Sequence, residues 1–205
     1  MTRIRQHVNP LTINNLSFKP DPINFNCKIT EVELGCAEGE FLFNRHQAKP
    51  EHLKIGLEIR EPLVKRLNKK ADKLNISKYV RGIFCNINIH FKDLFPPESV
   101  DRFFLNFPDP WFKTSHKKRR VFTSKLLNQI TQALKPEGEF FIQTDIFELA
   151  LESMFLLESE GWQEFTNQLG EWSFMPENPY GARTRREKYV SEDNKKIWRM
   201  LYIKS

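Results

Sequence analysis

The chain has 205 residues, a length suited to one domain with a substantial core, and it carries a formal net charge of +6. That positive charge is compatible with a polyanionic partner. The three cysteines lie far apart without a C-x-x-C pair, so neither a disulfide framework nor a metal site is expected, and a reducing cytoplasm suits the chain best. The first residues lack the apolar segment of a secretory signal, and no run approaches the ~18 apolar residues of a membrane span.

Residues 1–28 carry three prolines and little periodicity, which predicts an N-terminal arm; whether the arm folds or is a loosely packed tail is open. Residues 29–205 alternate strand and helix patterns, which predicts one α/β domain with a mostly parallel, doubly wound sheet. The expected strands are 29–34, 53–58, 79–84, a run from Phe103, 139–144, a start near Trp162, and 197–203. The last should pair antiparallel, because only a short connection precedes it. The expected helices are 41–46, 61–74, a helix or loop at 89–97, 122–134 ended by a stop signal at 135–138, and 146–160.

The turn after the first predicted strand reads Gly35-Cys36-Ala37-Glu38-Gly39. A strand, a glycine turn and a helix in this order are typical of a nucleotide-type site, where Gly35 and Gly39 let the backbone approach a ligand closely. Glu33 and the neighbouring glutamates would repel a pyrophosphate. S-adenosylmethionine carries a sulfonium and an ammonium instead, so an acidic turn accommodates it.

Two polar residues stand at the ends of the next two strands. Glu58 follows Gly35 at about the interval at which an acid meets the ribose hydroxyls, and a carboxylate accepts two hydrogen bonds from a diol. The alternative for Glu58 is a solvated acid at a strand end. Asn86 follows the third strand, where its amide can serve both an exocyclic amine and a ring nitrogen of adenine. By itself Asn86 would be taken as a turn residue.

The stretch from Phe103 to Arg120 changes from an apolar run to a basic segment through Pro108-Asp109-Pro110-Trp111. The two prolines restrict the backbone of Asp109, at the end of a strand where ligands bind in open α/β sheets. The cations beyond Trp111 and its neighbouring phenylalanine are suited to RNA, since cations contact phosphates and aromatic rings stack on bases. A solvated loop is the alternative.

Several segments together resemble the bacterial tRNA (guanine-N7-)-methyltransferases, from about Glu33 to Ser205. They are ELGCAEGEF, Glu58, PDPWFK followed by HKKRR, QTD ending at Asp145, and TRREK near the end of the chain. The resemblance implies a Rossmann-like, S-adenosylmethionine-dependent methyltransferase fold. It also implies methyl transfer to N7 of guanosine 46 in the variable loop of tRNA. Two positions depart from the family pattern: Ala37 replaces a frequent glycine, and Asn86 stands where Asp is common.

Carried over position by position, the resemblance also implies roles for individual residues. The implied cofactor residues are Glu33, Gly35, Gly39, Glu58, Asn86 and Asp109. The implied substrate residues are Lys113, Asp145, Thr184, Arg185, Arg186 and Glu187. The implied RNA-contacting residues are Ser115, His116, Lys117, Lys118, Arg119 and Arg120.

Guanine N7 has a free lone pair at neutral pH, so methylation needs positioning rather than a strong general base. The product purine is cationic, and a nearby carboxylate stabilises the developing charge. We assign Asp109 to this catalytic role, with Asp145 or Glu187 as second candidates. Two other classes stay open: a non-catalytic RNA-binding module on a methyltransferase fold, and a methyltransferase for a protein or small molecule. The choice of tRNAs, and whether the protein is a monomer or a homodimer, do not follow from the sequence.

Overall fold

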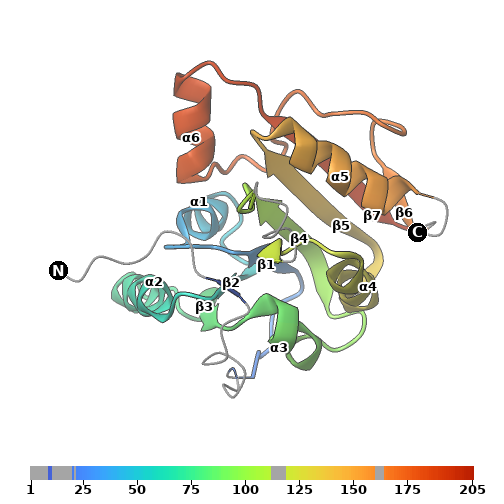
Figure 1. Ribbon diagram of the computed structural model, residues 1–205. Helices are drawn as coiled ribbons and strands as arrows, with labels where there is room; N and C mark the ends of the chain where they lie inside the picture. Colours follow the sequence, from blue (N-terminus) through green and yellow to red (C-terminus); the bar gives the residue numbers. More distant parts are fainter. Residues whose placement is uncertain (1–8, 11–19, 21, 112–118, 160–163) are drawn as a thin grey trace.

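The computed structural model describes residues 9–10, 20, 22–111, 119–159 and 164–205, which build one seven-stranded sheet of order β3-β2-β1-β4-β5-β7-β6 (Figure 1). The strands are β1 Thr30–Leu34, β2 Leu53–Glu58, β3 Val80–Phe84, β4 Val100–Asn106, β5 Leu134–Thr144, β6 Phe165–Asn167 and β7 Trp198–Lys204. Strands β1 to β5 pair in parallel, whereas β7 runs antiparallel to both β5 and β6. The predicted α/β sheet with an antiparallel last strand is therefore confirmed.

Helices cover both faces of the sheet (Figure 1). They are α1 Glu40–Ala48, α2 Glu61–Lys73, α3 Ile87–Leu94, α4 Ser124–Ala133, α5 Phe147–Glu158 and α6 Arg185–Glu192. The larger apolar cluster packs α3, α4 and α5 against one face. The smaller cluster packs α1, α2 and the loop around Tyr180 against the other face, which we call the α1 face. Among the described residues, no helix combines the length and apolar character needed to cross a membrane.

Side chains on the α1 face form rows across β1, β4, β5 and β7, because alternate residues of a strand point to the same side. One row, near the start of the parallel strands, consists of Glu31, Arg102 and Glu139. The next row is apolar except at β1, with Glu33 opposite Phe104, Phe104 opposite Phe141, and Phe141 opposite Leu201. The row at the carboxyl ends of β4 and β5 consists of Asn106, Gln143 and Arg199. Tyr180 covers the aromatic row, with its ring centroid 4.8 Å from that of Phe104.

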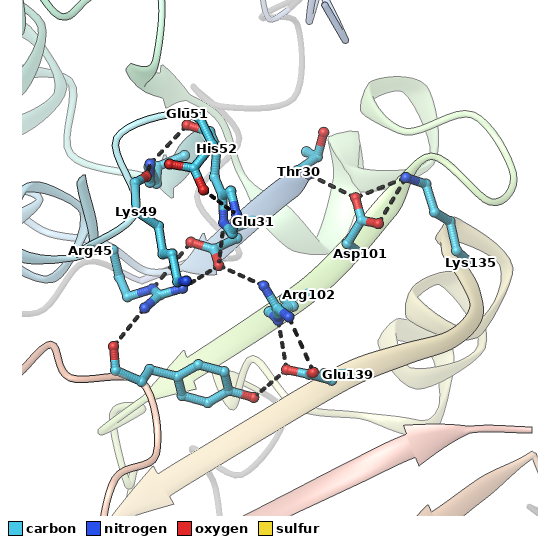
Figure 2. Close-up of polar contacts among 12 residues, drawn as sticks. Thr30, Glu31, Arg45, Lys49, Glu51, His52, Asp101, Arg102, Lys135 and Glu139 are labelled. Carbon is cyan, nitrogen blue, oxygen red and sulfur yellow. Dashed lines mark hydrogen bonds and ion pairs between the residues drawn. The ribbon is translucent and has the colours of Figure 1, made fainter. Parts of the chain in front are cut away.

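The first row is part of a buried ionic network (Figure 2). Glu31 is only 1% exposed, and it accepts hydrogen bonds from Arg45 (2.5 Å) and Arg102 (3.1 Å). Arg102 also pairs with Glu139 at 2.7 Å. Although burial favours the neutral acid, the hydrogen bond and the charge of Arg45 hold the pKa of Glu31 below its usual value. The network thus joins β1, β4 and β5 to α1 at the end of the sheet away from the glycine turn.

Two strand boundaries differ from the sequence prediction. Strand β4 begins at Val100 rather than Phe103, because the charged side chains of Asp101 and Arg102 have partners and do not interrupt the strand. Helix α4 ends at Ala133, just before the predicted stop signal at 135–138, but the strand expected from Glu139 is longer than predicted, since β5 begins at Leu134. The pairing register shifts between Val100 and Arg102, so the extra residues of β5 form a bulge. A Cβ on Gly138 would lie 2.8 Å from a backbone oxygen, so the bulge requires glycine there.

The described part of the predicted arm lies against the domain. Ile23, Phe25 and Cys27 are partly buried and pack on the larger apolar cluster. Farther upstream, the carbonyl of Pro10 accepts a hydrogen bond from Nδ2 of Asn86 at 2.5 Å. These contacts bring the arm to the carboxyl end of β3, while a domain boundary at residue 28 stays a prediction.

Candidate active site

The glycine turn between β1 and α1 has an unusual backbone. Gly35 and Gly39 have φ values of 78° and 74°, and Ala37 lies between them at φ 49°. A Cβ on Gly39 would lie 2.6 Å from Leu67, so α1 can begin close to α2 only with glycine at this position. Among the described residues other than its two chain neighbours, none has an atom within 4 Å of the Cβ position of Gly35, so they leave the turn open on that side. Ala37 has a left-handed backbone conformation, which glycine adopts more readily than alanine does.

Glu33 presents a buried carboxyl group just before this turn. It is 3% exposed, and its Oε1 accepts a hydrogen bond from Nδ2 of Asn106 at 2.8 Å. Its Oε2 is buried and has no hydrogen-bond partner among the described residues. Burial raises the pKa of Glu33 to about 8, and the charge of Glu58 adds to the shift. A cationic ligand group beside Oε2 would compensate this desolvated charge, so Glu33 fits the ammonium of S-adenosylmethionine.

We expect cofactor affinity to increase with pH below 8, because the raised pKa keeps Glu33 protonated and an ammonium needs the ionised form. Between pH 6 and pH 7, binding of S-adenosylhomocysteine measured by calorimetry should strengthen about tenfold. The Glu33→Gln variant should bind S-adenosylhomocysteine weakly and with little pH dependence. The pH dependence that remains in this variant reports titration of the ligand itself. The free energy of unfolding of the free protein should have the opposite trend. It should fall as pH rises from the unfolded pKa toward 8, since folded Glu33 retains its proton. Equal pH dependence in parent and variant would contradict this role.

Glu58 ends β2 as predicted, but its carboxylate is already saturated. It is 2% exposed and accepts hydrogen bonds of 2.9 Å from the backbone N–H groups of Ala37 and Arg60, and from the Nε and Nη2 atoms of Arg60. The hydrogen bond to Glu58 raises the pKa of Arg60, and the charge of Asp109 contributes to the shift. A ribose diol would have to replace part of this guanidinium contact. The ribose role of Glu58 therefore stays a prediction, and Arg60 joins the candidate site.

Asn86 begins α3 rather than standing free at the end of β3. Its Oδ1 accepts a hydrogen bond from the backbone N–H of Asn88 at 3.2 Å, an N-cap contact. Its backbone N–H donates to Nδ1 of His90 at 2.9 Å, so this histidine stabilises the first turn of α3. Asn86 thus lies at the predicted edge of the sheet, and its adenine role stays a prediction.

Asp109 lies on a strained loop that follows β4. The flanking residues Phe107 and Trp111 have φ values of 49° and 42°, a region that bulky side chains rarely occupy. Strain of this kind costs about 1–3 kcal/mol per residue and is concentrated at functional sites. Asp109 itself is exposed, and its negative charge contributes to the raised pKa of Arg60. The loop therefore holds a carboxylate near the predicted cofactor residues.

Arg119 and Arg120 both contact residues of this loop. The Arg119 guanidinium lies over the ring of Trp111, 5.1 Å from the centroid. Arg120 donates from Nε to the carbonyl of Pro110 at 2.9 Å and forms an ion pair with Glu152. Because Arg120 makes these contacts within the protein, it stabilises the loop in addition to any contact that it makes with RNA. The other predicted residues of this segment, Lys113, Ser115, His116, Lys117 and Lys118, lie outside the described residues.

The segment Thr184–Glu187 begins α6, a helix that the sequence analysis missed. Thr184 caps the helix, with its Oγ1 accepting from the backbone N–H of Glu187 at 2.9 Å. The Glu187 side chain is fully buried and accepts from Asn178 (3.1 Å), Gln143 (3.1 Å) and Arg199 (3.2 Å). Glu187 is therefore enclosed by protein groups rather than presented to a ligand. Its substrate role stays a prediction.

Asp145 and Arg186, both predicted as substrate residues, form a salt bridge of 2.5 Å. Asp145 follows the carboxyl end of β5, and Arg186 lies in the first turn of α6. Their neighbour Arg185 has a side chain that is 86% exposed. The structure thus brings β5 and α6 together at the same edge of the sheet as the glycine turn.

Sequence analysis missed four polar residues of this region: Arg60, Asn106, Gln143 and Arg199. Asn106 and Gln143 interrupt apolar strands near their carboxyl ends, and this interruption was the available signal. Arg199 lies in the alternating pattern of β7, where its burial depends on a neighbour far away in sequence. Thr184-x-x-Glu187 has the pattern of a capping box, which could have identified the start of α6.

Comparisons with known proteins identify the fold and the family of the chain. A family model described as "Putative methyltransferase" matches residues 28–200. A tRNA (guanine-N(7)-)-methyltransferase of Prochlorococcus marinus (strain NATL2A) is 36% identical over 98% of this chain and 97% of its own length. The enzyme of that name from Synechococcus elongatus is 34% identical over 98% and 96%, respectively. A SAM-dependent methyltransferase structure from Aquifex aeolicus shares the fold, with a TM-score of 0.58, 14% identity, and coverage of 89% of this chain and 85% of that one. The chain therefore belongs to the tRNA (guanine-N(7)-)-methyltransferase family.

Proposed function

We propose that the protein transfers a methyl group from S-adenosylmethionine to N7 of guanosine 46 in the variable loop of tRNA. The observation that carries the proposal is the similarity to named tRNA (guanine-N(7)-)-methyltransferases over nearly the whole chain. The buried, partly unpartnered carboxyl of Glu33 beside an open glycine turn supports the cationic cofactor. A tRNA substrate places the enzyme in the cytoplasm.

Different residues of the chain hold different parts of the cofactor. When bound, S-adenosylmethionine supplies an electrophilic methyl group on its sulfonium. Glu33 holds the cofactor ammonium, and the backbone at Gly35 leaves room for close approach. Glu58 accepts from the ribose hydroxyls once Arg60 yields part of its contact.

We assign the contact with the guanine to Asp109. The lone pair of N7 forms the new bond, so no proton has to be removed from that nitrogen. The Asp109 carboxylate stabilises the positive charge that the purine gains, and it can accept hydrogen bonds from guanine N1–H and the exocyclic amine. The hydrogen bond from N1–H distinguishes guanine from adenine, because adenine N1 carries no hydrogen. The strained loop fixes the carboxylate in advance, so little reorganisation is needed during the reaction.

Methyl transfer to defined transcripts tests the proposed function. Labelled S-adenosylmethionine and an unmodified tRNA transcript should give 7-methylguanosine on nucleoside analysis. A transcript with adenosine at position 46 should give none, because the target guanine is absent. Methylation of the altered transcript at an unchanged rate would reject position 46. Absence of 7-methylguanosine from every tRNA tested would reject the activity itself.

We expect the basic segment after Trp111 to contact tRNA phosphates. Each lost phosphate contact lowers the log–log slope of affinity against salt by about 1. Lys117→Ala with Lys118→Ala should therefore weaken tRNA binding and flatten that slope by about 2. We leave Arg120 unchanged because its side chain closes the loop internally.

The matched control for this salt experiment is Lys69→Ala with Lys73→Ala on the exposed face of α2. It removes the same charge from an element outside the segment proposed to contact RNA, so its slope should stay close to that of the parent. Filter binding at four salt concentrations measures all three proteins. Identical slopes for the two double variants would favour a solvated loop at 117–118.

A further inference from the structure

A continuous chain of polar side chains, all buried except the half-buried Asn106, connects Glu33 to α6. Asn106 donates from Nδ2 to Glu33 at 2.8 Å and accepts at Oδ1 from Nε2 of Gln143 at 2.9 Å. The same Nε2 of Gln143 donates to Glu187 at 3.1 Å, and Oε1 of Gln143 accepts from Arg199 at 3.2 Å. Gln143 and Glu187 are both fully buried. The chain therefore joins the predicted cofactor carboxylate to the predicted substrate helix without a solvent-exposed link between Gln143 and Glu187.

The register of the sheet builds this chain. Asn106 of β4 lies directly opposite Gln143 of β5, and Gln143 lies directly opposite Arg199 of β7. Side chains opposite one another on the same face are close enough to hydrogen-bond. Hydrogen bonds between the strands fix these positions, so the spacing of the three side chains is set by the backbone.

Each amide in the chain has only one orientation that satisfies its neighbours. Both N–H groups of Gln143 are used, one by Asn106 and one by Glu187, and its oxygen receives Nε of Arg199. Rotating the amide by half a turn would place the oxygen against the Glu187 carboxylate and the nitrogen against a guanidinium. Asn106 is fixed in the same way, since its nitrogen faces Glu33. The chain thus has a defined direction, which allows a change at one end to affect the other.

At its far end the chain holds α6 and the loop before it. Asn178 donates from Nδ2 to Glu187 at 3.1 Å and to the carbonyl of Ala182 at 2.9 Å. Arg199 donates from Nη1 to the carbonyl of Pro176 at 3.1 Å. The position of α6, and of Arg185 and Arg186 on it, therefore depends on the contacts of Glu187.

We propose that Asn106 and Gln143 are positioning residues that couple cofactor binding to tRNA binding, so that each ligand increases the affinity for the other. The proposal rests on the proposed function, because it takes Glu33 as a cofactor residue and α6 as part of the tRNA site. A ligand ammonium holds Glu33 in its ionised form, and the hydrogen bond from Asn106 then becomes charge-assisted and stronger. That bond polarises the next one and fixes Glu187. Thermodynamic reciprocity requires tRNA to raise cofactor affinity by the same factor.

The test measures the Kd of tRNA with and without saturating S-adenosylhomocysteine, which carries the ammonium but no transferable methyl group. In the parent the ligand should tighten tRNA binding by about fivefold or more. In Gln143→Met and in Asn106→Leu, which keep approximate volume but remove the hydrogen bonds, the ratio should fall close to 1. Gln132→Met, the same change at an exposed glutamine of α4, should keep the parental ratio.

Two further measurements separate coupling from a purely structural role. Asn106→Leu removes the hydrogen bond that opposes the raised pKa of Glu33, so the pH dependence of cofactor binding should move to higher pH. Gln143→Met leaves that bond in place and should shift this pH dependence less. Asn106 is only half-buried, so Asn106→Leu provides the test if Gln143→Met fails to fold.

A parental ratio near 1, or an unchanged ratio in both folded variants, would overturn the coupling. These outcomes stay distinct from failure of the proposed function, since the parent's formation of 7-methylguanosine is assayed separately. If the parent methylates tRNA but shows no coupling between the two ligands, only the proposed coupling is refuted.

Discussion

Replacing Asp109 by Asn is expected to lower the turnover number of methyl transfer by about 10²–10³-fold, the usual effect of removing one preorganised electrostatic group. The substitution keeps the size of the side chain and one acceptor oxygen, but it removes the negative charge that we propose to face the purine cation. Asp109 is exposed, and its two neighbouring prolines fix the backbone, so the thermal unfolding midpoint should change little. Single-turnover rates at saturating tRNA and cofactor measure the chemical step directly.

A matched control for this experiment is Asp72→Asn, which removes an exposed carboxylate from α2. It changes the net charge of the protein by the same amount, so any general effect on tRNA attraction appears in both variants. The control should retain the parental rate. If Asp109→Asn also retains that rate, the charge of Asp109 is not needed, and Asp145 becomes the carboxylate to test next.

Glu31→Ala is expected to lower the free energy of unfolding by about 3–5 kcal/mol, because it leaves buried cations without their partner. Arg45 is 4% exposed and donates to Glu31 through both Nε and Nη2. The loss is a large part of the 5–15 kcal/mol that typically stabilises a domain. Urea unfolding followed by circular dichroism measures it.

The control for this stability experiment is Glu61→Ala, which breaks the exposed i, i+4 pair with Lys65 on α2. Such a pair contributes about 0.3–0.5 kcal/mol, so the difference between the two variants should be clear. Cofactor affinity of folded Glu31→Ala should stay close to that of the parent, since the ion pairs of Glu31 are with Arg45, His52 and Arg102 and not with a predicted cofactor residue. A stability loss below 1 kcal/mol would show that solvent or rearranged side chains replace Glu31.

The local sequence was sufficient to predict most strands of the sheet. Strand β2 matches its prediction at both ends, because Leu53–Glu58 is a buried run between turns. The start of β4 was missed because Asp101 and Arg102 look like loop residues until their partners on neighbouring elements are known. Helix α6 was missed because only Glu187 and Val190 of its residues are buried, which leaves almost no apolar stripe.

The candidate site was predictable where a role depends on position along one strand. Glu33 and Glu58 were found because they stand next to a turn after a strand, which local sequence shows. Gln143 was missed because its role depends on the register of three strands, including one that pairs antiparallel. The contact between Arg60 and Glu58 depends on how two neighbouring side chains turn toward each other, and alternation along a strand does not predict it.

The place of β7 has a consequence for biosynthesis. This strand is synthesised after every other described element, yet it lies between β5 and β6 in the sheet. On the ribosome, β5 therefore waits with one edge unpaired until β7 emerges, and such an edge is prone to wrong pairing. Arg199 arrives with β7, so α6 gains its anchor at the same moment. A nascent chain should consequently leave α6 without its Arg199 anchor until the last strand is in place, and the predicted substrate residues on α6 would be held in position only on a finished sheet.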